Sequence, residues 1–225
     1  MRFNARLLVS LCLLTLILAL FKFPYPRDRL PQSDGQAQAR TVPGTKSAVQ
    51  PANPTAAKIV AAAKAQQGTL YDASYVKIAY PNGDVPRERG VCTDVIVRAL
   101  RKVGYDLQRL MHEDMKRNFS IYPNKWGLRR PDPNIDHRRV PNQMKFFKRF
   151  GIELTRKVSA DTLKQWQPGD FVYWDIGGPL HTGVLSNNVN SSGVPLVVHN
   201  LGGCREEDVL TTWKIIGHFR YPVQK

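Results

Sequence analysis

The sequence predicts an α+β domain in which several helices precede an antiparallel sheet. Up to about residue 150, apolar residues recur with helical spacing; after Pro168 they form short runs rich in β-branched and aromatic residues. Hydrophobic residues make up 42% of the 225 residues, which is enough for a core, and we find no internal repeat. We place this domain at residues 55–225.

Helical periodicity appears in four segments of the first half. Residues 56–67 form an alanine-rich helix that Thr55 caps, and residues 90–104 form a strongly amphipathic helix with Cys92 at its start. Two further helices are predicted, one that Asp106 caps and one marked by Met144, Phe147 and Phe150. The irregular segment 118–143 separates them, and a loop of this length inside a domain is often functional.

The strands are expected after a turn at Pro168-Gly169-Asp170. Four runs are predicted to be strands, namely residues 171–174, 180–185, 196–199 and 215–221, with 187–193 as a hairpin loop. Alternation along the second strand places His181 and Gly183 on one face. His199 ends the third strand.

The N-terminal segment predicts export. Residues 1–23 combine two early arginines with an uncharged apolar run, as a signal peptide or N-terminal membrane anchor does, and whether the leader is cleaved stays open. Residues 24–54 have the composition of a flexible linker. We therefore expect a periplasmic or cell-envelope location, with a possible membrane tether through the leader.

The chain is strongly basic, with a formal net charge of +15. Residues 40–225 hold 28 Lys and Arg against 16 Asp and Glu, a balance of +12. Such a charge favours anionic lipid, an acidic wall polymer or nucleic acid. No block of consecutive basic residues and no groove-reading motif occurs, so we expect no nucleic-acid partner.

Cys92 is the first candidate functional residue. A cysteine at the positive end of a helix is favoured as a thiolate, although free cysteines are also common in cores. Cys92 and Cys204 could instead form a disulfide in an oxidising compartment, which would silence the thiol. We expect no bridge, because Cys204 follows two glycines in a turn.

A nucleophilic thiol needs a base and a group that orients the base. If the Cys92 helix lies across the sheet, its start can approach the strand that carries His181. His199 or Asn200 on the next strand could then orient the imidazole. A zinc site built from Cys92, His181 and His199 is the weakest alternative, because close ligand pairs are absent from the sequence. We expect neither a metal nor another cofactor.

Several local motifs match known bacterial proteins. Cys92-Thr93-Asp94, Pro168-Gly169-Asp170-Phe171-Val172, His181-Thr182-Gly183-Val184 and Val197-Val198-His199-Asn200 resemble the NlpC-type papain-like cysteine peptidases of bacterial cell walls. Longer runs, including His112-Glu113-Asp114-Met115, residues 134–142 and residues 217–222, resemble the YijF-type family of uncharacterised bacterial proteins.

The NlpC-type resemblance implies a papain-like fold and an enzyme. It makes Cys92 the nucleophile, His181 the base and later the acid, and His199 the orienting residue, with Asn200 as the alternative. The expected reaction is cleavage of an amide bond in peptidoglycan stem peptides. The interval of 89 residues between Cys92 and His181 is long for that family, which leaves the choice of substrate open.

The extra length lies in the irregular segment, where Asp136, His137, Arg138 and Arg139 follow one another. Guanidinium groups there could bind stem-peptide carboxylates, or the charges could simply be solvated. The sequence thus predicts an exported cysteine hydrolase with peptidoglycan or another cell-envelope polymer as its partner. The alternative is a non-catalytic binding module of the cell envelope.

Overall fold

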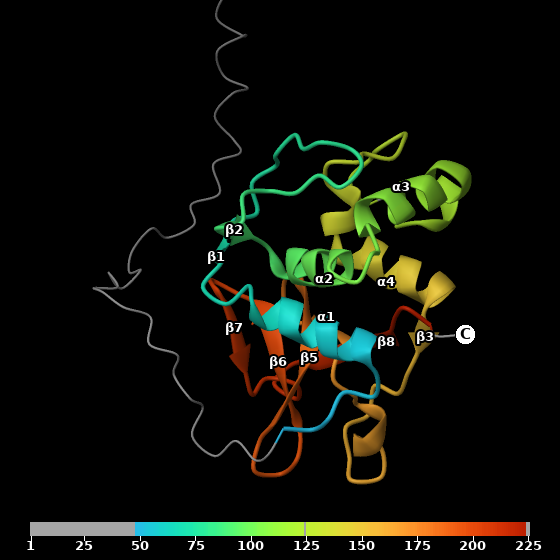
Figure 1. Ribbon diagram of the computed structural model, residues 1–225. Coiled ribbons are helices and arrows are strands. Elements are labelled where there is room, and N and C mark those ends of the chain that lie inside the picture. The colour runs from blue at the N-terminus through green and yellow to red at the C-terminus, as the bar shows by residue number, and fades with distance from the viewer. Residues whose placement is uncertain (1–47, 124, 224–225) are drawn as a thin grey trace, which may run out of the picture. The chain divides into compact units, whose positions relative to one another are not determined.

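The computed structural model describes residues 48–123 and 125–223 (Figure 1). The predicted signal or anchor, and the linker up to residue 47, lie outside the described residues. Within these residues, helices and a six-stranded antiparallel sheet form an α+β fold, as predicted. No helix in this part of the chain is both long and apolar enough to span a bilayer.

The sheet has the strand order β3-β8-β4-β5-β6-β7, and every neighbouring pair is antiparallel. Its strands are β3 (Ile152–Glu153), β4 (Phe171–Asp175), β5 (Leu180–Val189), β6 (Pro195–Asn200), β7 (Cys204–Glu207) and β8 (Lys214–Arg220). The four predicted strands correspond to β4, β5, β6 and β8. The two short edge strands, β3 and β7, were not predicted.

Four helices accompany the sheet: α1 (Pro54–Lys64), α2 (Cys92–Arg101), α3 (Leu107–Asn118) and α4 (Val140–Phe150). Asn53, rather than Thr55, caps α1, because its side-chain oxygen accepts a hydrogen bond from the Ala56 N–H at 2.8 Å. The segment predicted to be irregular contains two 3₁₀ turns, Phe119–Ile121 and Asp136–Arg138. A third 3₁₀ turn spans Leu163–Gln165, and a small parallel pair consists of β1 (Leu70–Tyr71) and β2 (Arg89–Gly90).

The two faces of the sheet bury different clusters. The face toward the helices carries Phe171, Tyr173, Val184 and Val198, which pack with α2 and α4 in the larger core. The opposite face carries a smaller cluster: Trp166, Val172, Trp174, Leu185, Val197 and Leu210. The alternation of side chains along each strand therefore decides which core a residue enters.

Asp170, in the turn before β4, fixes the C-terminal strand. Its two carboxylate oxygens accept hydrogen bonds from the Arg220 guanidinium at 2.7 and 2.8 Å, and His218 Nε2 lies 3.1 Å from Oδ2. The Trp166 ring stacks on the His218 ring with centroids 3.8 Å apart. The acidic residue of the Pro-Gly-Asp motif thus joins the start of β4 to the end of β8.

Candidate active site

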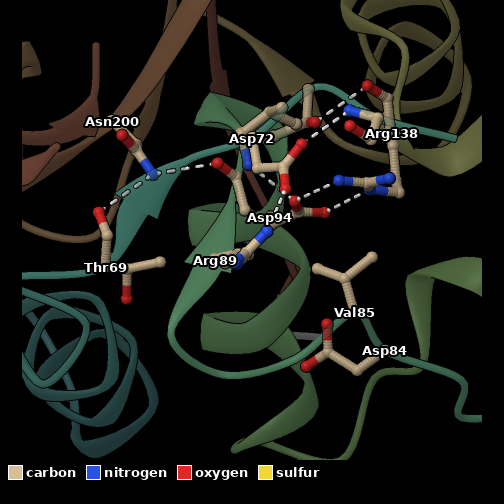
Figure 2. Close-up of polar contacts among 12 residues, drawn as sticks. Thr69, Asp72, Asp84, Val85, Arg89, Asp94, Arg138 and Asn200 are labelled. Carbon is tan, nitrogen blue, oxygen red and sulfur yellow. Dashed lines mark hydrogen bonds and ion pairs between the residues drawn. The ribbon is translucent and has the colours of Figure 1, made fainter. Parts of the chain in front are cut away.

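The start of α2 is held by a buried ion pair (Figure 2). The Val91 N–H donates to Asp94 Oδ2 at 2.7 Å, which places a carboxylate in the first turn of the helix. The Arg138 guanidinium donates to both oxygens of the same carboxylate, at 2.8 Å each, and the two side chains are 2% and 3% exposed. The first turn of α2, which begins at Cys92, is therefore fixed by two charged side chains that have almost no access to water.

Asn200 fixes the strand that leads into α2. Its side-chain Nδ2 donates to the carbonyl oxygen of Gly90 at 3.1 Å and, over a longer distance of 3.4 Å, to that of Thr69 (Figure 2). Its Oδ1 is buried and has no hydrogen-bond partner among the described residues. In this structure the Asn200 amide therefore contacts backbone groups near Cys92 and not an imidazole ring.

Cys92 is the first residue of α2, as predicted, and is only 6% exposed. Burial raises the pKa of its thiol to about 12, since a thiolate loses hydration in the core. The backbone N–H of Thr182 opposes this rise in pKa, as do, to a smaller extent, those of Thr93 and Cys92, while the Asp94 charge adds to it. The helix start therefore supplies N–H groups that lower the pKa of the thiol, but in the free protein the loss of hydration raises this pKa by more.

Two polar side chains near the sulfur were not singled out from the sequence. Burial raises the pKa of the Tyr173 hydroxyl, and the charge of Cys92 raises it further. This hydroxyl donates a hydrogen bond to Gln143 Oε1 at 3.0 Å. The Gln143 amide in turn donates to the carbonyl oxygens of His137 at 2.8 Å and Thr93 at 3.3 Å. Tyr173 lies in a run predicted to be a buried strand, and Gln143 lies at the end of the segment predicted to be irregular, so neither polar group gave a separate signal.

His181 and His199 lie in direct contact on the sheet. His181 Nε2 is 2.8 Å from His199 Nδ1, and the two side chains are 2% and 1% exposed. His199 Nε2 lies 2.9 Å from a carboxylate oxygen of Glu207 on β7, close enough for an ion pair, although the direction of its N–H is poor for a hydrogen bond. Glu207 was not predicted because the sequence gave no indication of strand β7.

Aromatic rings surround this pair. The Trp174 ring lies parallel to His181 at 5.7 Å between centroids, and Trp213 meets both imidazoles edge-on. Burial lowers the pKa of His181 to about 3, and the neighbouring His199 contributes to that shift. Burial also lowers the pKa of His199, while Glu207 partly opposes the decrease. Both imidazoles are therefore neutral near pH 7.

Cys92 and the histidine pair meet strand β5 from opposite sides. His181 is paired with Trp174, of the smaller cluster, whereas Cys92 packs in the larger core against the next residue, Thr182. Helix α2 does approach the strand that carries His181, but it covers the face of Thr182 and not that of Gly183. Within the described residues, no hydrogen bond joins Cys92 to either histidine.

Of the four charged residues predicted to bind substrate, Asp136, His137 and Arg138 form a 3₁₀ turn against α2, α3 and α4, and Arg139 follows directly after it. Asp136, His137 and Arg138 are buried, and burial lowers the pKa of His137 to about 3. Arg139 remains partly exposed, with an ion pair to Asp136 at 2.9 Å and its guanidinium 3.9 Å from the Trp126 ring. Substrate binding by this turn stays a prediction that depends on Arg139, because Arg138 is already engaged by Asp94.

The remaining candidates concern the cysteines and a metal. Cys92 and Cys204 are both free thiols in the larger core. Among residues 48–123 and 125–223, no group of three or more His, Cys, Asp and Glu side chains is arranged to hold a metal ion.

Comparisons with known proteins place the sequence in a family. The family described as "Domain of unknown function (DUF1287)" matches residues 59–221. The "Uncharacterized protein YijF" of Escherichia coli (strain K12) is 52% identical over 157 residues, which cover 69% of this chain and 75% of that protein. No solved structure matches the chain, so the papain-like arrangement has no structural neighbour to support it.

Proposed function

The chain belongs to the DUF1287 family, and we propose that it is an exported cysteine hydrolase of the periplasm or cell envelope. Its proposed substrate is an amide bond in peptidoglycan stem peptides. The proposal keeps Cys92 as nucleophile, His181 as base, and His199 as orienting residue, and it adds Glu207 behind His199. The papain-like fold belongs to the same proposal.

The observation that carries the proposal is the chain of contacts from Glu207 through His199 to His181. If His199 carries its proton on Nε2, the ring atom that lies 2.9 Å from a Glu207 carboxylate oxygen, its Nδ1 is a hydrogen-bond acceptor. His181 then donates from Nε2 across the 2.8 Å contact, and its Nδ1 is left as an unprotonated base. Such an ordered series of carboxylate and imidazole groups is what a thiol nucleophile requires.

In the proposed reaction, the Cys92 thiol transfers its proton to His181 Nδ1 as Sγ attacks the amide carbonyl carbon. Backbone N–H groups at the start of α2 donate to the oxygen that gains negative charge. The C–N bond then breaks, and His181 gives the proton to the leaving amine. Water, activated by the same imidazole, hydrolyses the thioester and restores the thiol.

This mechanism depends on contact between Sγ and the imidazole. Separately, the buried thiol and the buried imidazole each favour the neutral form, with pKa values of about 12 and about 3. Proton transfer between them becomes favourable only if the resulting thiolate and imidazolium lie close enough to stabilise each other. The proposal therefore requires Sγ to reach His181 past Thr182 when substrate is bound.

A second candidate is a non-catalytic cell-envelope binding module. The observation that favours it is the burial of Cys92 on the sheet face opposite the histidines, with a thiol pKa of about 12. A binding module needs neither an ionised sulfur nor a paired base. It would use the +12 charge of residues 40–225 to retain an acidic polymer.

Digestion of purified peptidoglycan, followed by mass analysis of the soluble fragments, separates the two candidates. The hydrolase predicts new stem-peptide fragments with the wild-type chain, and none with Cys92→Ala or His181→Ala. Cys204→Ala is the matched control, because it removes the other buried core thiol without removing the nucleophile. Equal turnover by Cys92→Ala would disprove the thiol mechanism, and salt-sensitive binding without cleavage by any variant would favour the module.

A further inference from the structure

A large cavity lies away from the histidine pair. It has a volume of about 1180 Å³ and opens between α1, α2 and the loop that precedes β2. We call this cavity the basic groove. Its charged lining residues are Lys58, Asp84, Arg87, Glu88, Arg98, Arg101 and Lys102. Ligand pockets for small molecules usually reach about 300–1,000 Å³, so the groove has room for a longer chain.

The cations of the groove fall into two groups. Arg98 is already engaged within the chain, because its Nε donates to the Asp84 carboxylate and its Nη2 donates to backbone carbonyl oxygens. Arg101 also binds Asp84, at 3.3 Å. Lys58, Arg87 and Lys102, by contrast, are exposed and make no ion pair with any described residue. These three positive charges are available to a ligand.

Between the charges, the lining is apolar and small. Ala61, Ala62 and Ala65 of α1 line the groove, and Leu70, which is 60% exposed, lies at the end near β1. No aromatic side chain belongs to the lining, which disfavours sugar rings and nucleic-acid bases, since both are commonly stacked on such rings. A concave groove also fits a flat bilayer poorly. The combination of small apolar side chains with unpaired cations favours a peptide that carries carboxylates and small side chains.

The N-terminal segment of the same chain is excluded as the occupant by its charge. Residues 1–39 hold five Lys and Arg against two Asp and Glu, so this segment and the groove have the same sign of charge. An acidic partner is complementary to the groove and a basic tail is not.

One hydrogen-bonded side chain links the groove to the segment that precedes α2. The lining of the groove includes Thr69. The Asn200 side-chain amide donates to the carbonyl oxygens of both Thr69 and Gly90, and Gly90 lies two residues before Cys92. A peptide that lies along α1 and ends at Thr69 therefore comes within one shared side chain of the segment that leads into Cys92.

We propose that the basic groove binds the carboxylate-bearing part of a stem peptide through Lys58, Arg87 and Lys102. This inference rests on the proposed function for the identity of the peptide, although the binding itself needs no catalysis. It assigns recognition of the carboxylates to α1, α2 and the loop before β2, instead of the turn at residues 136–139.

The test measures binding of a synthetic stem peptide of alanine, D-glutamate and a diamino acid to the full chain by calorimetry. All proteins carry Cys92→Ala, so that cleavage cannot interfere. The groove variant combines Lys58→Gln, Arg87→Gln and Lys102→Gln. The matched control combines Lys116→Gln, Arg156→Gln and Lys214→Gln, which removes the same charge from exposed residues outside the groove.

We expect the groove variant to bind at least about fivefold more weakly, and the control variant to bind as the parent does. A peptide with its carboxylates amidated should bind as weakly to the parent as the acidic peptide does to the groove variant. Equal weakening in both triple variants would overturn the proposal, because it would indicate attraction by net charge alone. Unchanged binding in the groove variant would overturn it as well.

The two proposals can fail separately. Groove-dependent binding, with no cleavage of the same peptide by the chain that retains Cys92, would sustain the groove and end the proposed hydrolysis. Cleavage by a chain that carries only the three groove substitutions, with an unchanged KM, would sustain the hydrolysis and end the proposed groove.

Discussion

His181 and His199 are in contact because the residue of β5 that is paired with His199 is a glycine, Gly183. His199 is paired directly with Gly183, and His181 lies two residues away on the same face of β5. Since Gly183 has no side chain, the His199 ring has room to lie along β5 and reach His181 at 2.8 Å. The glycine of the His181-Thr182-Gly183-Val184 motif thus serves the contact between the two imidazoles.

Substitution of Gly183 should therefore disturb the pair. A Cβ at this position would lie 2.5 Å from Val197 Cγ1 and 3.0 Å from His199 Cβ, so Gly183→Ala forces neighbouring atoms apart. We expect a loss of about 1–3 kcal/mol in the free energy of unfolding, measured by urea denaturation. Gly178→Ala is the control, because its Cβ would meet no atom within 4 Å. Equal stability of the two variants would contradict this account of the glycine.

Removal of the Glu207 charge should shift the titration of His199. Burial lowers the pKa of His199, and the carboxylate of Glu207 partly opposes that decrease. Glu207→Gln should therefore lower this pKa further, as measured by NMR titration of the imidazole C–H signals. If the hydrolase proposal holds, activity should also fall roughly tenfold, a size typical of residues that act through another side chain. An unchanged or higher His199 pKa would contradict the role of Glu207.

The Cys92 thiol should react slowly in the free protein. With a pKa of about 12, it stays protonated at neutral pH, and its alkylation by iodoacetamide should accelerate about tenfold per pH unit up to at least pH 10. The measurement uses mass spectrometry of the peptide that contains Cys92, in a Cys204→Ser background. A rate that is already at its plateau near pH 7 would mean that the thiol is ionised, against the stated pKa. If His181 becomes the base only when substrate is bound, adding the stem peptide should raise the rate, and His181→Ala should abolish that rise.

The Asp94–Arg138 pair should contribute strongly to stability. Arg138→Ala leaves the carboxylate of Asp94 buried without its partner, so we expect a loss of about 3–5 kcal/mol in urea unfolding. Arg109→Ala provides the comparison, because Arg109 and Glu113 form an exposed ion pair, whose loss should cost about 0–1 kcal/mol. Similar losses in the two variants would contradict a special contribution from the buried pair.

Stability should decrease as the solution becomes more acidic. His137 has a pKa of about 3 in the folded chain against an ordinary value of 6.5, so between these values the unfolded chain binds more protons. The contribution of neutral His137 to the free energy of unfolding is therefore complete above about pH 6.5. It is lost as the pH falls toward 3, by up to about 1.4 kcal/mol per pH unit. Urea unfolding at pH 7, 5.5 and 4 measures this slope, and His137→Gln should reduce it. An identical slope in the variant would show that His137 does not titrate in this way.

The sequence predicted most of the secondary structure because long periodic segments carry a strong signal. Helix α2 and strands β4, β5, β6 and β8 lie where the spacing of apolar residues indicated. Strands β1, β2 and β3 have only two residues each, too few to show alternation, and they form because neighbouring strands supply their hydrogen bonds.

The candidate site was harder to predict than the fold. Alternation correctly placed His181 on the face of Gly183, but it cannot indicate which face α2 covers, because both faces of β5 are buried. The charges at residues 136–139 suggested a solvent-facing loop, whereas Arg138 is buried and paired with the carboxylate of Asp94, 44 residues earlier in the chain. Such long-range pairs leave no trace in local sequence patterns.

The position of β8 has a consequence for the order in which the domain can be built. This strand, Lys214–Arg220, is the last strand of the described residues, yet it lies between β3 and β4 in the interior of the sheet. Until the ribosome has released these residues, β3 has no neighbour in the sheet and one edge of β4 is unpaired. The sheet therefore cannot be completed before β8 has been synthesised, and a chain that lacked this strand would present an open edge to its neighbours.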